Sequence, residues 1–88
     1  MKKLAIVTGA NKGLGLSVAQ KLVHDNYKVI LACRDKTKGQ QAEKFLGENT
    51  TFMELDLSDP KSIDNFSNEI SQSYSGVNVL YNNAGLIY

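Results

Sequence analysis

The sequence predicts an α/β protein with a parallel sheet, built in the order βαβαβαβ. Short apolar runs rich in β-branched residues alternate with stretches of helical periodicity, and the connections between them are short. The apolar runs are nearly continuous, which is typical of parallel strands covered on both faces. Right-handed crossovers between such units most simply give the strand order 3-2-1-4. We therefore expect the first strand near the middle of the sheet.

The first unit is a strand expected over residues 3–7 and a helix expected over residues 15–25. Asn26 supplies the signal that ends this helix. The apolar residues of the helix fall on one stripe, formed by Leu16, Ala19, Leu22 and Val23.

The second unit begins with a strand over residues 28–33. Asp35 is placed to cap a second helix, and Gly47 is placed to end it. We expect the buried face of this helix to consist of Ala42, Phe45 and Leu46.

The third strand is expected over residues 50–55, and Asp59-Pro60 then opens a third helix, because proline suits the first helical position. Gly76 is expected to break this helix before a fourth strand over residues 77–81. The helix carries one predicted buried stripe, which consists of Ile63, Phe66, Ile70 and Tyr74.

Composition and charge exclude several classes of function. At 88 residues with 42% hydrophobic residues, the chain is at most one small domain, and its net charge of +1 indicates neither nucleic acid nor a membrane surface as a partner. Its single cysteine, Cys33, cannot form an internal disulfide, and we expect it to be a small buried core residue rather than a nucleophile. No apolar stretch approaches the ~20 residues of a membrane span, and the apolar run after Met1 is too short for a signal peptide. We expect a cytoplasmic protein.

Residues 8–15, Thr-Gly-Ala-Asn-Lys-Gly-Leu-Gly, lie between the first strand and the first helix. Gly9 allows a sharp turn out of the strand, because glycine adopts positive φ without steric cost. Gly13 lets the backbone approach a pyrophosphate, and Gly15 lets the helix pack closely on the strand. The helix N-terminus after such a turn favours phosphate.

Four polar turns fall at the carboxyl ends of the predicted strands: residues 9–14, residues 33–35, Asp56 and residues 82–85. In an open parallel sheet these ends share one edge, where ligands bind. The convergence favours a binding site over four unrelated connections.

Other candidates for functional residues are weaker. No cluster of His, Cys and Asp has metal-ligand spacing, and His24 suits a role at the end of the first helix, while Glu54 reads as solvated.

The glycine turn and Asn82-Asn83-Ala84-Gly85 resemble two motifs of the short-chain dehydrogenase/reductase family, in its classical, carbonyl-reductase-like branch. The resemblance covers the whole chain and implies the N-terminal, NAD(P)-binding portion of a Rossmann-type fold over residues 1–88. It implies that Asp56 meets the adenine amino group and that Thr8 ties the first strand to the asparagine loop. The cofactor-binding residues that follow from it are Gly9, Asn11, Lys12, Gly13, Leu14, Gly15, Arg34, Asp56, Leu57, Asn82, Ala84 and Gly85.

The end of the second strand favours NADP over NAD. NAD-binding members carry an acid there, but this sequence has Cys33 followed by Arg34, and an arginine can hold the 2′-phosphate of NADP. Lys12 adds a second positive charge. Asp35 is the alternative, as an acid of the NAD type, but its place beyond the strand end suits a helix cap better.

The family's catalytic serine and Tyr-x-x-x-Lys pair are not in this sequence, so no catalytic residue is assigned. The leading interpretation is a truncated cofactor-binding half of an NADP-dependent oxidoreductase, which would transfer hydride to a small carbonyl substrate in the complete protein. A non-catalytic nucleotide-binding or interaction module and an inactive truncated product remain alternatives. An exposed edge on the fourth strand would favour self-association.

Overall fold

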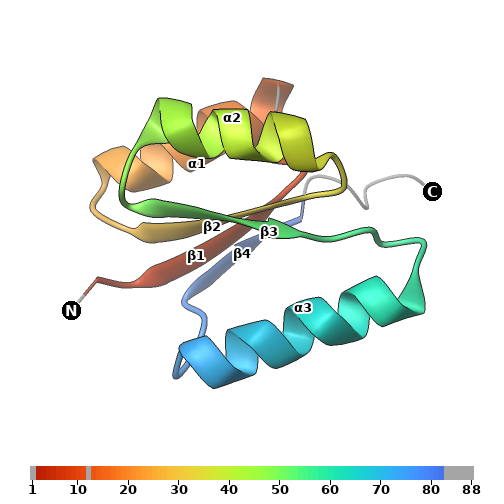
Figure 1. Ribbon diagram of the computed structural model, residues 1–88. Helices are drawn as coiled ribbons and strands as arrows, with labels where there is room; N and C mark the ends of the chain where they lie inside the picture. Colours follow the sequence, from red (N-terminus) through yellow and green to blue (C-terminus); the bar gives the residue numbers. More distant parts are fainter. Residues whose placement is uncertain (1, 12, 83–88) are drawn as a thin grey trace.

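The computed structural model describes residues 2–11 and 13–82, and it has the predicted element order. Its four strands form one parallel sheet in the order β3-β2-β1-β4, as expected (Figure 1). The strands are β1 (Leu4–Thr8), β2 (Lys28–Cys33), β3 (Thr50–Glu54) and β4 (Val79–Tyr81). The helices are α1 (Gly13–His24), α2 (Lys36–Leu46) and α3 (Pro60–Ser73).

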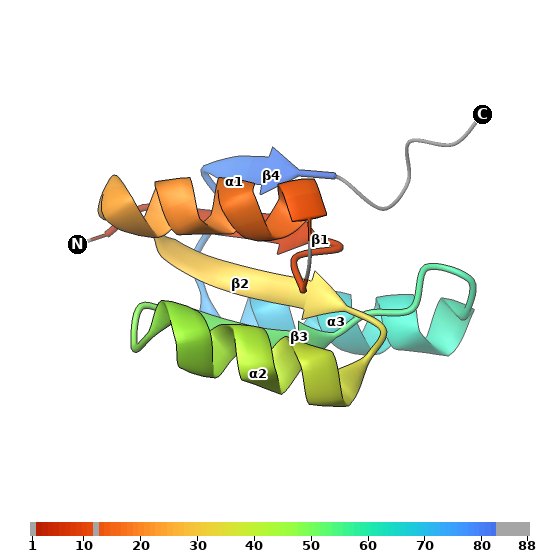
Figure 2. The same ribbon diagram turned by 90° about the horizontal axis from the view of Figure 1, so that it is seen from above.

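Helices cover both faces of the sheet. Helices α1 and α2 lie side by side on one face and α3 lies on the other (Figures 1 and 2). Because side chains alternate along a strand, β1 sends Ala5 and Val7 into the core under α1 and α2, while Leu4 and Ile6 face α3. The centre of β2 is sealed on both sides, and Val29, Ile30 and Leu31 have no exposed surface. This explains why the strands read as continuous apolar runs.

The helix ends follow the predicted capping chemistry. The Asp35 carboxylate accepts from the Lys38 N–H at 3.0 Å and caps α2, and Asp59 caps α3 by accepting from the Lys61 N–H at 3.1 Å. The chain leaves α1 through Asn26, which has φ 72°, and the backbone N–H of Gly47 closes α2 by donating to the Glu43 carbonyl at 2.9 Å.

One face prediction was wrong. Phe45 is 69% exposed, whereas Ala42 is buried and Leu46 packs against the core. The residue that completes the buried stripe of α2 is Gly39. With 3.6 residues per turn, a stripe through positions 39, 42 and 46 leaves Phe45 to one side of it. A small residue at position 39 therefore decides which face of α2 is buried.

The third helix packs more loosely than the sequence suggests. Phe66, Ile70 and Tyr74 pack against the core but are only partly buried, Ile63 is 39% exposed, and α3 has no fully buried residue. Helix α3 is the only described element on its face of the sheet, so it covers that face incompletely (Figure 1).

The start of β4 also differs from the prediction, since regular pairing begins at Val79 rather than Val77. The Leu4 N–H donates to the side-chain Oδ1 of Asn78 at 2.9 Å, and the Asn78 N–H donates to the Leu4 carbonyl at 2.9 Å. The side chain of Asn78 thus takes the place that a backbone acceptor would have in a longer strand.

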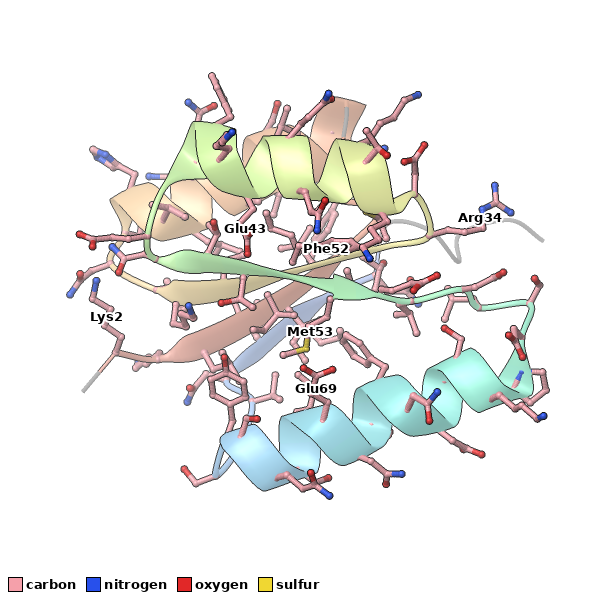
Figure 3. The ribbon with its side chains drawn as sticks, viewed as in Figure 1. Lys2, Arg34, Glu43, Phe52, Met53 and Glu69 are labelled. Carbon is pink, nitrogen blue, oxygen red and sulfur yellow. The ribbon has the colours of Figure 1, made fainter. Side chains whose placement is uncertain are left out.

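Helix α2 also protects the outer edge of β3 (Figure 3). The Leu55 N–H donates inward to the Cys33 carbonyl, so by alternation the N–H groups of Thr50 and Phe52 point outward. The Phe52 N–H donates to Oε2 of Glu43 at 2.8 Å, and the Thr50 N–H donates to the Gly47 carbonyl at 3.1 Å.

Candidate functional site

A hollow of about 440 Å³ lies at the carboxyl ends of β1, β2 and β3, within the 300–1,000 Å³ range of small-molecule sites. It brings together segments that are far apart in the sequence, as the predicted topology requires. Its lining consists of Thr8, Gly9, Asn11, Ala32, Cys33, Arg34, Asp35, Lys38, Leu55, Asp56, Leu57 and Ser58.

The turn after β1 has the backbone conformation that its glycines predict. Gly9 has φ 62° and Gly13 has φ 58°, both in the left-handed region that favours glycine. The Gly9 N–H donates to the Ala32 carbonyl at 2.8 Å, which ties the turn to β2. A Cβ at Gly13 would meet no atom within 4 Å, so the space beside this residue is open at the N-terminus of α1. The turn therefore has room and backbone geometry for a phosphate group.

Two further residues of the turn lie on α1 itself. Gly15 is buried, in line with its predicted packing role, and Leu14 is 62% exposed. Neither lines the hollow, and Gly13 does not line it either. Lys12 lies outside the described residues.

Thr8 connects the first and fourth strands as expected. Thr8 is only 5% exposed, and its hydroxyl donates to Oδ1 of Asn82 at 3.0 Å. This bond holds the beginning of the asparagine loop beside the carboxyl end of β1. Ala84 and Gly85, which the resemblance also assigns to the cofactor, lie outside the described residues.

The end of β2 combines a buried thiol with exposed positive charge. Cys33 is the last strand residue. Its thiol donates to the Asp35 carbonyl at 3.4 Å, and burial raises the pKa of this thiol above the usual 9.0. Arg34 follows directly and lines the hollow, and its side chain extends away from the sheet (Figure 3). Lys38, in the first turn of α2, lines the same hollow. Two cations, Arg34 and Lys38, thus line this wall together with Asp35.

Asp35 acts as a helix cap, as proposed from its position. Its Oδ1 accepts from the Lys38 N–H, although the residue also lines the hollow. The structure confirms the cap, and Asp35 still has a second carboxylate oxygen at the hollow.

The loop after β3 presents Asp56 and Leu57 to the hollow. The Ser58 hydroxyl and N–H both donate to the Asp56 carboxylate, at 2.6 and 3.0 Å, and they lower the pKa of Asp56 below 3.8; the nearby charge of Arg34 lowers it further. Leu57 is 45% exposed and offers an apolar surface beside the carboxylate.

The sequence analysis missed four lining residues: the apolar Ala32 and Leu55 at the strand ends, and the polar Lys38 and Ser58. Lys38 comes three residues after a helix cap, so it lies in the first turn of α2 and faces the same edge as Arg34. Ser58 follows Asp56 by two positions, the spacing at which an aspartate bonds the backbone of a turn. Both sequence patterns are visible, but only the arrangement of the loops shows that the two side chains line the hollow.

Within residues 2–11 and 13–82, no group of three or more His, Cys, Asp or Glu side chains is arranged to hold a metal ion. Of the helices in this part of the chain, none has the length and apolar character needed to span a bilayer.

Comparison with known proteins gives a consistent result. The profile of the family described as short chain dehydrogenase matches residues 3–88. The chain is 38% identical over 91 residues to carbonyl reductase [NADPH] 1 of Rattus norvegicus, covering 99% of this chain and 33% of that protein. It is 36% identical over 90 residues to salutaridine reductase of Papaver somniferum, covering 97% of this chain and 29% of the relative.

Solved structures agree with the sequence relatives. The menthone neomenthol reductase of Mentha piperita superposes with a TM-score of 0.86 at 34% identity, over 98% of this chain and 32% of that one. The chain spans about a third of the length of the relatives it matches. The family profile covers nearly all of the sequence, and the sheet order, the glycine turn and the hollow are those of a dinucleotide-binding fold. The chain belongs to the short-chain dehydrogenase family.

Proposed function

We propose that this chain binds NADP(H) at the carboxyl edge of its sheet, as the cofactor-binding part of a carbonyl reductase. The observation that carries the proposal is the hollow between the glycine turn and the loop after β3, with Arg34 and Lys38 in its wall. The open space at Gly13 and the N-terminus of α1 suit the pyrophosphate. The relatives named as carbonyl reductases [NADPH] support the same cofactor.

The residues divide the work of binding. Gly9 and Gly13 shape the phosphate turn, Asp56 and Leu57 flank the adenine, and Arg34 grips the ribose 2′-phosphate through its planar fork of donors. The proposed cofactor contacts also include Asn82, Ala84 and Gly85, which the family resemblance assigns. When bound, the nicotinamide supplies a hydride. Reduction of a small carbonyl compound is proposed for a polypeptide that also carries the family's serine and Tyr-x-x-x-Lys.

The test is a titration of the protein with NADPH and with NADH. A charge-assisted contact to the 2′-phosphate contributes roughly 1.5–3 kcal/mol, so we expect NADPH to bind about 10- to 150-fold more tightly. Arg34→Ala should remove most of this preference and leave the affinity for NADH nearly unchanged. Lys36→Ala is the matched control, because Lys36 is an exposed cation at the start of α2 that does not line the hollow.

Three results would contradict the proposal. Equal affinity for the two dinucleotides would exclude the 2′-phosphate contact, and tighter binding of NADH would favour Asp35 as a ribose-binding acid. Loss of affinity in the Lys36 variant equal to that in the Arg34 variant would show a general charge effect. An intact mass measured on the same sample, set against 9.7 kDa for this sequence, would show whether the native polypeptide carries the catalytic part as well.

Self-association and cellular location are finer proposals. Strand β4 lies at the end of the strand order, and Leu80 on it is 64% exposed, so we expect pairing between copies at this edge when nothing else covers it. Sedimentation velocity across a concentration series measures this directly, and a monomer at all concentrations would refute it. We also propose a cytoplasmic location, which cell fractionation tests.

A further inference from the structure

The Asp56 residue at the lip of the hollow is held by hydrogen bonds on three of its groups. Its N–H donates to the Ser62 hydroxyl at 2.9 Å, and its carbonyl accepts from the Asp59 N–H at 3.0 Å. Its Oδ1 accepts twice from Ser58, from the hydroxyl at 2.6 Å and from the N–H at 3.0 Å. The other carboxylate oxygen, Oδ2, has no hydrogen-bond partner among the described residues. The carboxylate is thus fixed by one oxygen and available by the other.

We propose that Ser58 is a positioning residue that aims the Asp56 carboxylate at the amino group of the adenine ring, so that the site selects adenine over hypoxanthine. The inference rests on the proposed function, because it concerns the base of the same dinucleotide. What points to Ser58 is the pair of hydrogen bonds that it donates to a single carboxylate oxygen of Asp56.

The selectivity follows from hydrogen-bond polarity. An ionised carboxylate only accepts, so it pairs with the amino group that adenine presents and repels the carbonyl oxygen that hypoxanthine presents at the same place. An aspartate is ionised, and therefore acceptor-only, at neutral pH, and the Ser58 donors lower the pKa of Asp56 further. Leu57, next in the chain and 45% exposed, gives the face of the base an apolar contact. The carboxylate then distinguishes adenine from hypoxanthine by the group that each base presents to it.

The tether matters because a free aspartate side chain samples three staggered χ1 wells and a broad χ2. A charge-assisted hydrogen bond predicts at least a tenfold preference for adenine in the native protein. Release of the side chain into about three wells lowers the productive fraction about threefold. Ser58→Ala keeps the main-chain N–H, so we expect the preference to fall about two- to threefold.

The experiment measures dissociation constants for NADPH and for its hypoxanthine counterpart, nicotinamide hypoxanthine dinucleotide phosphate in reduced form. The readout is the ratio of the two constants, which a general loss of stability does not move. Ser58→Ala should lower the ratio, and Ser58→Thr, which keeps the hydroxyl, should restore it. Asp56→Ala gives the reference value of this ratio when the carboxylate is absent. Ser71→Ala is the control, because the Ser71 hydroxyl only donates to the Ser67 carbonyl within α3.

Each outcome has a defined meaning. If the native protein binds neither dinucleotide, the proposed function itself fails. If it binds both equally well, the proposed function stands and the adenine contact of Asp56 is refuted. A ratio in Ser58→Ala equal to that of the native protein overturns the role of Ser58. Should Ser58→Ala fail to fold by circular dichroism, Ser58→Gly takes its place, because it also removes the hydroxyl and keeps the main-chain N–H. An unchanged ratio in Ser58→Gly overturns the role of Ser58.

Discussion

Replacement of Gly39 by alanine should destabilise the protein, although alanine is the better helix former. Gly39 lies on the buried face of α2, and a Cβ at this position would collide with the ring of Phe52 on β3 and come within 2.9 Å of the Cys33 sulfur. Ordinary Gly→Ala substitution in a helix gains up to about 1 kcal/mol. Overpacking of a close contact costs typically 1–3 kcal/mol.

The contact geometry decides which effect is larger. The Phe52 backbone cannot shift away, because its N–H donates to Glu43 and the strand is paired to β2, so the ring can yield only by leaving its present rotamer. We therefore place the Gly39→Ala cost toward the upper end and expect a net destabilisation of about 1–2 kcal/mol. For a domain of 60–100 residues this corresponds to a fall in Tm of roughly 4–16 °C.

Thermal unfolding followed by circular dichroism measures this shift, with two controls. Gly76→Ala adds a methyl group where no atom lies within 4 Å, so it should have little effect. The double variant Gly39→Ala/Phe52→Val removes the ring that the methyl group meets, and it should recover part of the stability lost in Gly39→Ala. A Gly39→Ala protein that melts higher than the native one would refute the reasoning, since helix propensity would then outweigh the contact.

Three further predictions concern single residues. Thr8→Val removes the hydroxyl that donates to Asn82 and should cost about 1 kcal/mol in chemical denaturation, and an unchanged midpoint would show that the β1–β4 tie is dispensable. Asp59→Ala removes the cap of α3 and should cost about 0.5–2 kcal/mol, whereas Asp64→Ala in the same helix should not. Burial raises the pKa of Cys33 above 9.0, so its thiol should react slowly with a disulfide reagent at neutral pH, and the reaction rate should still increase as the pH passes 9. Rapid labelling of the thiol at pH 7 that denaturant does not change would contradict this.

The sequence was sufficient for the features that local chemistry decides. Asp35 and Asp59 cap their helices because a carboxylate before a helix bonds its first free N–H groups, whatever the rest of the fold does. The strand order follows from the alternation of strands and helices. The positive φ of Gly9 follows from its place after a strand.

Features that depend on contacts between elements were not predictable in this way. Phe45 has the right spacing for a buried face, but the close approach at Gly39 rotates α2 so that Phe45 points to solvent. The roles of Lys38 and Ser58 arise only when their loops meet at one edge of the sheet. Propensity and periodicity describe one element at a time, and these residues act between elements.

The bond from Phe52 to Glu43 has a consequence for how this sheet can be extended. On the β3 side, the outward N–H groups of Thr50 and Phe52 are already taken by partners in and directly after α2, so an added strand would have to displace a carboxylate that is 2.8 Å from its donor. The β4 side presents no such obstacle among the described residues. We therefore expect a further strand to pair with the sheet beside β4 rather than beside β3.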